Sequence, residues 1–411
     1  MKILRKERSP ALAFIFITLL IDVTGFGLVI PVLPDLILHL SGGSHEHGAR
    51  VYGSLLSVFG LMQFLCAPIL GNLSDRFGRR PVLLVSLAFA AGDYVLQAVA
   101  PTIAWFFLGR VIVGITGASF SAATAYIADI TPPEKRAQNF GMIGTAFGLG
   151  FIIGPAIGGL LGGIGPRVPF WAAAGVTLLN FLYGYFVLPE SLGPENRRPF
   201  TVANANPFKS LAIIGRHRWV LMLCGMASLL WLAQQVPPSI WVLYTEYKFH
   251  WGRSENGSSL AALGAATMFV QMVVIRQMTQ RMSLPRMLAF SLVFNFIGFI
   301  LMGTAPNGGV MLASMLLWTL CFVGGPAIQS MVSEQFGADE QGAIQGAMSG
   351  VMALCGVVGP LAFSWIFGYF TGPSPIKLPG APFLIGAVLT VFAAVIAYKA
   401  VTIRSQAGIS S

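Results

Sequence analysis

Charge is what this sequence lacks most. Only 10% of its 411 residues are Asp, Glu, Lys or Arg, against about 25% in ordinary soluble domains. Hydrophobic residues make up 55% of the chain, which excludes a soluble enzyme with one anchor and indicates a polytopic membrane protein in a lipid bilayer. The net charge of +10 would suggest nucleic-acid binding in a soluble chain. Here basic loops account for it, so no nucleic-acid partner is expected.

The usual signals for cofactors and metals are also scarce. The sequence has no phosphate-cradling loop and no nucleophile–base constellation, so neither nucleotide-driven pumping nor an enzyme is expected. His45-Glu46-His47 has a spacing that could bind metal, but its Gly/Ser-rich surroundings predict a solvated external loop. No resident metal is therefore expected. Cysteine argues against a disulfide or metal framework as well, because the four thiols stand in apolar runs without paired spacing: Cys66, Cys224, Cys321 and Cys355.

Long apolar runs dominate the chain instead. Runs near the ~20 residues that a helix needs to cross a bilayer predict an all-α membrane protein with twelve spans. The first run follows the basic stretch Met1–Pro10 and lacks a small-residue cleavage site, so it is expected to remain as an uncleaved span. The predicted spans are 11–37, 51–73, 82–100, 102–128, 138–161, 168–188, 219–244, 257–279, 285–304, 309–333, 342–370 and 381–402.

The chain divides at its middle into two similar halves. The proline-rich polar stretch 189–218 predicts a linker between six-helix bundles at 1–188 and 219–411. A shift of 205 residues places Glu134 on Asp339, Gly154 on Gly359 and Pro155 on Pro360. This repeat predicts duplication of a six-helix unit and two parallel, pseudo-symmetric bundles around a central cavity, which is a transporter fold.

A dense charged turn, GNLSDRFGRRP at 71–81, joins two of the apolar runs. Its arginines place it on the cytoplasmic side, where basic loops are retained. With the N-terminus inside, nineteen of the 25 lysines and arginines fall on the cytoplasmic side, five on the other side and Arg110 within a span. The bias predicts that both termini are cytoplasmic.

Ionisable groups inside spans are the first candidates for chemistry, because each costs about 2.5–3.5 kcal/mol to insert. Of the fifteen acids only Asp22 and Asp93 lie well within spans, and Arg110 lies in the fourth. Either acid could take up and release a proton, with Arg110 setting the affinity by its fixed charge. The alternative is a static buried ion pair that holds helices together.

Two further sets of residues are candidates for helix contacts or for a substrate cavity. In the fifth span Gly150, Gly154 and Gly158 recur four residues apart and Pro155 adds a bend, so that a neighbouring helix could approach closely. Ordinary helix packing explains this pattern equally. Polar and aromatic residues on other spans could line a cavity, although helix–helix hydrogen bonding explains each of them as well: Gln63, Gln234, Gln235, Gln329 and Trp241.

The motifs resemble one transporter family. The turn 71–81 is similar to the loop 2–3 signature of the major facilitator superfamily, and the fifth span to the Gly-Pro "antiporter motif" of its proton-coupled drug exporters. Further stretches resemble the bacterial tetracycline/proton antiporters: IDVTGFGLVIPVLPDL, LMQFLCAPILGNLSDRFGRRPVLL, GDYVLQA, QVPPSIWVLYTE and EQGAIQG.

The resemblance implies an alternating-access exporter that exchanges a cytoplasmic drug for a proton. The drug would be tetracycline-like, carried as a chelate with a divalent cation such as Mg²⁺, and the location would be the bacterial inner membrane. Asp22, Asp93 and Arg110 fall on functional positions within the membrane, and Gln63 on a substrate contact.

The resemblance also implies a cytoplasmic gate at Asp75 and Arg79, with Asp129 as a partner for the gate arginines. The sequence departs from the family in the ninth span, which has no acid and offers only Asn295 as a polar stand-in. A facilitator that imports a sugar or organic anion remains an alternative, because one fold serves both activities.

Overall fold

The computed structural model describes residues 8–117, 119–132, 136–200, 218–333 and 341–406. All regular elements in these ranges are helices. By its contacts the chain divides into two compact units. The first unit contains the described parts of Met1–Leu40, Val58–Pro207 and Trp251–Ala265, and the second contains those of Ser41–Ser57, Phe208–His250 and Ala266–Ser411.

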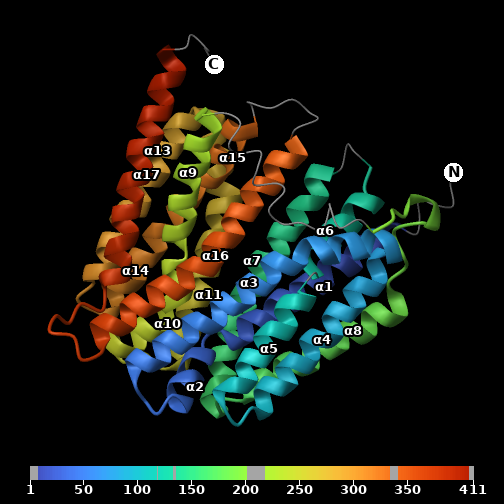
Figure 1. Cartoon of the computed structure of the whole chain (residues 1–411), viewed down its shortest axis with the longest axis horizontal. Helices are drawn as coiled ribbons and strands as arrows, with labels where there is room; N and C mark the ends of the chain where they lie inside the picture. Colours follow the sequence, from blue (N-terminus) through green and yellow to red (C-terminus); the bar gives the residue numbers. More distant parts are fainter. Residues whose placement is uncertain (1–7, 118, 133–135, 201–217, 334–340, 407–411) are drawn as a thin grey trace. The chain divides into compact units, whose positions relative to one another are not determined.

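In the first unit α1 packs against α7 and α8, and α4 packs against α5, α6 and α8 (Figure 1). Its buried side chains include Phe14, Phe106, Tyr126 and Phe170. The helices that contribute to it are α1 (Arg8–Val29), α2 (Leu33–Leu40), α3 (His45–Phe77), α4 (Arg79–Val99), α5 (Ile103–Thr116), α6 (Ser119–Ile130), α7 (Arg136–Ile164), α8 (Val168–Val187), η3 (Pro194–Asn196) and the start of α11 (Arg253–Phe269).

In the second unit α17 packs against α9 and α13, and α16 packs against α9 and α10 (Figure 1). Two irregular turns interrupt its apolar segments: η6, a π-helical turn at Val270–Val274, and η7, a 3₁₀ turn at Thr319–Val323. The α-helices that it adds are α9 (Arg218–Gln234), α10 (Val236–Phe249), α12 (Ile275–Arg281), α13 (Leu284–Thr304), α14 (Gly308–Trp318), α15 (Gly324–Ser333), α16 (Gln341–Thr371) and α17 (Ala381–Gln406).

Within the described ranges, ten helical segments are long and apolar enough to cross a membrane. The predicted span 102–128 is divided into α5 and α6, and the span 219–244 into α9 and α10. The second break lies at Gln235 and precedes Pro237 and Pro238, which have no backbone N–H to donate to the preceding turn. The twelve predicted spans therefore each correspond to one helix or to consecutive shorter ones.

The internal repeat is visible in the helix boundaries. A shift of 205 residues carries both ends of α4 onto those of α13. Pro155 and Pro360, which the same shift aligns, lie inside α7 and α16 without ending them. Glu134, Asp339 and residues 201–217 of the predicted linker lie outside the described residues, and the boundaries at 188 and 219 stay a prediction.

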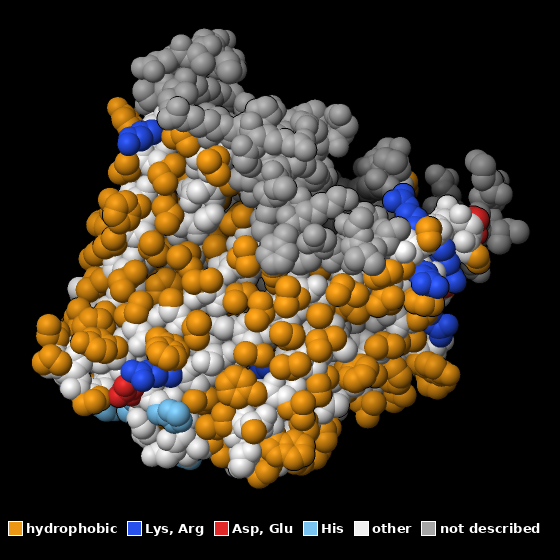
Figure 2. All heavy atoms as spheres, in the orientation of Figure 1, with side chains coloured by type: hydrophobic (Ala, Val, Ile, Leu, Met, Phe, Trp, Pro, Cys, Tyr) orange, Lys and Arg blue, Asp and Glu red, His pale blue; other side chains and the backbone are white. Residues whose placement is uncertain are grey.

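The surface of the described residues is largely apolar, which indicates a location in a lipid bilayer. On the face in Figure 2 hydrophobic side chains cover most of the described surface, and most visible charged side chains lie toward its margins. Large apolar side chains such as Leu160, Ile164 and Phe186 are 66–77% exposed. An apolar surface of this kind suits lipid and not water. With its apolar helices it identifies an integral, multi-pass membrane protein.

Candidate functional site

A buried polar cluster lies between α4 and α5. Asp93 and Arg110, both predicted from the sequence, are 4% and 6% exposed. Gln97 lies one helical turn after Asp93 and joins them: its amide Nε2 donates to Asp93 Oδ2, and its Oε1 accepts from Arg110 Nη2 at 2.9 Å. Gly109 leaves room for the carboxylate, because a side chain there would collide with Asp93 Oδ1. Sequence reasoning missed Gln97, although its spacing of four from Asp93 was the available signal.

Tyr94 connects this cluster to Asp22. Asp22 is half-buried on α1, and Tyr94 lies within electrostatic reach of Asp22, Asp93 and Arg110. A methyl group on Gly25, three residues after Asp22, would lie 3.5 Å from the Tyr94 hydroxyl. The three ionisable residues predicted within the membrane are therefore brought into one neighbourhood of the first unit, across α1, α4 and α5.

The second unit has a neutral polar cluster around Asn295 in the ninth predicted span. Asn295 on α13 is 1% exposed. Its Oδ1 accepts from Trp318 Nε1 at 2.8 Å, and its Nδ2 donates to Thr390 Oγ1 at 2.9 Å. The oxygen and the nitrogen of its amide thus join α13 to α14 and to α17. Asn295 is a structural bridge here and offers no proton-carrying carboxyl.

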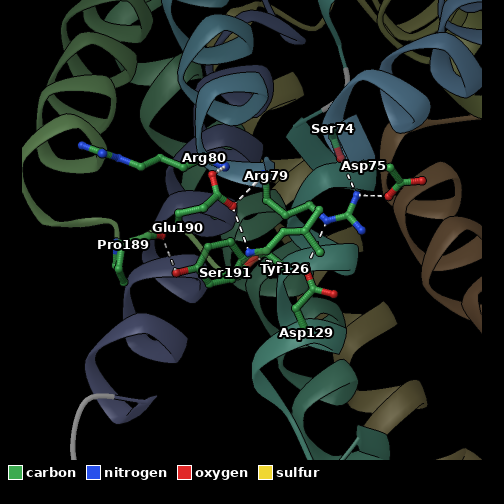
Figure 3. Close-up of polar contacts among 10 residues, drawn as sticks. Ser74, Asp75, Arg79, Arg80, Tyr126, Asp129, Pro189, Glu190 and Ser191 are labelled. Atoms are coloured by element: carbon green, nitrogen blue, oxygen red, sulfur yellow. Dashed lines mark hydrogen bonds and ion pairs between the residues drawn. The ribbon is translucent and has the colours of Figure 1, made fainter. Parts of the chain in front are cut away.

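A second polar cluster surrounds the charged turn between α3 and α4 (Figure 3). Gly78 alone separates the two helices and has φ of +108°, a conformation that favours glycine. Arg79, at the start of α4, pairs through Nη1 with Asp75 Oδ1 at 2.5 Å and through Nε with Asp129 Oδ2 at 3.1 Å. Its Nη1 also donates to Ser74 Oγ at 2.5 Å. The three predicted gate residues are therefore in direct contact within the first unit.

The start of the predicted linker is docked on this turn, which sequence reasoning missed. Glu190 accepts from the backbone N–H groups of Arg79 at 2.8 Å and Arg80 at 3.2 Å, so its carboxylate caps the N-terminus of α4. Ser191 Oγ donates to Asp129 Oδ2 at 3.1 Å, and Figure 3 shows both residues beside Arg79. An acid two residues after the end of a predicted span was the available signal.

Glu190→Ala is expected to destabilise the protein by about 1–2 kcal/mol, because two N–H groups at a helix N-terminus lose their acceptor. Thermal unfolding of the purified protein in detergent, followed by circular dichroism, would measure the loss. Glu195→Ala is the matched control, since Glu195 is exposed in the same segment. Equal unfolding temperatures for the two variants would contradict the capping role of Glu190.

The opposite end of α4 is also held by a side chain of suitable charge. Arg167 donates from Nη1 to Ala98 O at 2.9 Å and from Nη2 to Ala100 O at 2.7 Å. A cation is favoured at a helix C-terminus, as an anion is at the N-terminus. The helix that carries Asp93 and Gln97 is therefore anchored at both ends by groups that its dipole favours.

The glycine stripe of α7 faces α1. A methyl group on Gly150 would lie 2.8 Å from Val23 Cβ, and one on Gly154 would lie 2.7 Å from Gly27 Cα. Gly158 is tighter still, since its methyl group would collide with the backbone of Leu28. The stripe allows α1, which carries Asp22, to approach α7 at backbone distance. This is the close packing that the small-residue pattern predicted.

A further ion pair lies near the other end of the first unit. Arg253, at the start of α11, reaches Asp35 Oδ2 from Nε at 2.7 Å and from Nη2 at 2.6 Å. Its Nη1 donates to Gly162 O at the end of α7, at 2.9 Å.

The segment 45–47, predicted as a loop, belongs to the second unit and forms the first turn of α3. There Glu46 pairs with Arg50 at 2.5 Å and the His45 ring packs edge-on against Tyr247.

The predicted substrate contacts are distributed over both units. In the first, a methyl group on Gly117 would lie 3.7 Å from the Gln63 amide nitrogen. In the second, Gln234 ends α9 and Gln235 packs against Gly359 of α16. Trp241 is 3% exposed in α10, whereas Gln329 is exposed on α15. Their contact with a substrate stays a prediction.

These observations define the class: a helical, multi-pass membrane protein built from a repeated unit, with a buried acid–amide–arginine cluster. The family model of the Major Facilitator Superfamily matches residues 15–360. The chain belongs to this superfamily of transporters.

Its relatives and structural neighbours agree. The chain is 39% identical over 383 residues to the class C tetracycline resistance protein of Escherichia coli, covering 93% of this chain and 95% of that one. It is 38% identical to the class G tetracycline resistance protein of Vibrio anguillarum, with the same coverage of both chains. The crystal structure of the nucleoside transporter NupG matches the fold with a TM-score of 0.77 at 12% identity, over 95% of this chain and 98% of that one.

Proposed function

We propose that this protein exports an amphipathic drug in exchange for protons, by alternating access. The leading candidate for the substrate is a tetracycline-like compound, carried as its Mg²⁺ chelate. Two curated relatives at 38–39% identity are named tetracycline resistance proteins, which favours a drug over the sugar or organic anion of an uptake permease. The observation that carries proton coupling is the buried Asp93–Gln97–Arg110 cluster, because an ionisable group at this depth needs a reason to be there.

The residues of the first unit would handle the proton. Asp93 would accept it on the outer side of the membrane and release it on the inner side, with Asp22 as a second carrier. Apolar surroundings favour the neutral carboxyl, and the Arg110 guanidinium favours the ionised one. These opposed influences allow a buried acid to change its charge during a transport cycle.

The Arg79 cluster would lie at the cytoplasmic end of the protein, in a bacterial inner membrane with both termini inside. The bias of basic residues toward that side supports this orientation. There Asp75, Arg79 and Asp129 would act as a gate that controls access from the cytoplasm. The ion pairs of Arg79 support the role, because they connect the turn after α3 to the end of α6.

Everted membrane vesicles that contain this protein test the proposal. Respiration acidifies the vesicle interior, and a pH-sensitive fluorescent dye reports the gradient. Addition of tetracycline with Mg²⁺ is expected to dissipate part of the gradient, because drug entering the vesicle is exchanged for protons leaving it. Vesicles without the protein should show no such change.

Two comparisons make the result specific. Glu195→Gln removes an exposed acid of the central segment and is expected to leave the drug-dependent signal unchanged. Sugars and organic anions, added in place of the drug, are expected to give no signal. The opposite result would contradict drug export and favour the uptake permease. In that result sugars or organic anions cause proton movement, and none of a broad panel of drugs does.

A further inference from the structure

Asp93 and Arg110 do not form a direct ion pair. Within the described chain no Arg110 nitrogen lies within 4.0 Å of an Asp93 oxygen. The Gln97 amide occupies the space between them and is fully buried. A buried arginine beside a buried aspartate would normally pair with it, since a direct charge-assisted bond is the stronger contact. The intervening amide is therefore a feature to explain.

The chemistry of the partners determines how the amide is oriented. Arg110 can only donate, so the amide oxygen must face it, and the amide nitrogen then faces the carboxylate. Asp93 Oδ1 and Arg110 Nε are buried and have no hydrogen-bond partner in the described chain. Gln97 thus uses one carboxylate oxygen and leaves the other able to carry a proton without breaking any contact.

The surroundings leave few other groups to act on Asp93. Arg110 of α5 is the charge that acts on it directly. Asp22 of α1, like Asp93 and Arg110, lies within electrostatic reach of Tyr94. Arg110 itself also faces the Phe59 ring of α3, 5.9 Å from its Cζ atom. Of the other helices packed on α4, α6 places its Asp129 in the Arg79 cluster, and the described part of α8 carries no charged side chain.

We propose that Gln97 is a positioning residue that keeps Arg110 from pairing directly with Asp93. By doing so it sets the pH at which Asp93 exchanges its proton. A neutral amide stabilises the ionised carboxylate less than a guanidinium would. The inference rests on the proposed proton coupling. The experiments below measure the pH midpoint separately from the presence of proton exchange, so failure of one idea can be distinguished from failure of the other.

Two variants at this position are expected to shift the pH profile in opposite directions. Gln97→Met keeps the volume but removes the bridge, so Arg110 can reach Asp93 and favour its ionised form. The midpoint of the pH profile of drug-dependent proton exchange should then fall by about one pH unit. Gln97→Glu places a second carboxylate beside Asp93, and two carboxylates that share a site retain a proton more strongly. That midpoint should rise by about one unit.

Ser86→Ala is the matched control, because Ser86 is also buried on α4 but lies outside the cluster. It is expected to leave the midpoint unchanged. If Gln97→Met and Gln97→Glu keep the midpoint of the unaltered protein while exchange persists, the positioning role is overturned and proton coupling stands.

A spectroscopic titration tests the inference without transport. Infrared difference spectra of the purified protein report the C=O stretch of a protonated carboxyl, and the band that Asp93→Asn removes belongs to Asp93. Its midpoint should move down in Gln97→Met and up in Gln97→Glu. A stationary midpoint would refute the role of Gln97, whereas shifted midpoints in a protein that exchanges no protons would refute the proposed function alone.

Discussion

Asp93→Asn is expected to reduce drug-dependent proton movement to the level of vesicles that lack the protein. Asparagine has nearly the shape of aspartate and can still accept a hydrogen bond from Gln97, but it cannot carry a proton. Asp22→Asn is expected to have an effect of the same kind. The dye assay in everted vesicles measures both, with the amount of folded protein determined in parallel by size-exclusion chromatography.

Loss of activity alone would not distinguish a proton carrier from a static ion pair. Asp93→Asn leaves the buried charge of Arg110 without its counter-charge. Breaking a direct buried ion pair costs about 3–5 kcal/mol, and the loss here is expected to be smaller because Gln97 separates the two groups. The double variant Asp93→Asn/Arg110→Gln removes both charges and should recover folding. If it also recovers uphill drug transport, the cluster only holds helices together. Recovered folding without transport would support proton carriage.

Gly158→Ala is expected to abolish most of the folded protein. The added methyl group would lie 2.8 Å from both the Cα and the carbonyl carbon of Leu28. Backbone atoms cannot turn aside as a side chain can, so α1 and α7 would have to separate. Gly150→Ala should be milder, because its nearest neighbour is the Val23 side chain. Fluorescence-detected size-exclusion chromatography would compare the yields.

The same helix supplies the controls for this experiment. Gly144 and Gly163 are exposed on α7, and a methyl group on either would meet no described atom within 4 Å beyond its chain neighbours and the adjoining backbone of α7. Alanine at these positions should be tolerated or stabilising, since glycine in a helix interior costs about 1 kcal/mol relative to alanine. Equal losses for Gly144→Ala and Gly158→Ala would mean that helix flexibility, and not contact with α1, explains the stripe.

The role of the stripe bears on transport as well as folding. Gly150, Gly154 and Gly158 bring α7 against the helix that carries Asp22. Any change in the α1–α7 distance would move that carboxyl relative to Tyr94 and Asp93. A packing function and a transport function of these glycines are therefore compatible, because the contact positions a residue of the proposed proton site.

Much of the architecture follows from sequence patterns. Apolar runs of bilayer length predicted the spans, and the turn at 71–81 was identified from its charges. The 205-residue shift predicted a repeat whose helices α4 and α13 have matching ends. These features depend on composition and on local spacing, which are properties of consecutive residues. Breaks within spans were less predictable, since η6 and η7 interrupt apolar runs that composition alone describes as continuous.

The sequence by itself determined the class of protein, the number of apolar segments and the few ionisable residues that enter them, because the bilayer imposes these requirements on each segment separately. Only the tertiary structure decided which residues those charges meet. Gln97 stands between Asp93 and Arg110, and Glu190 returns from the end of α8 to cap α4. The Gln97–Arg110 contact and the contacts of Glu190 join residues from separate helices or segments, so they exist only once the helices have packed.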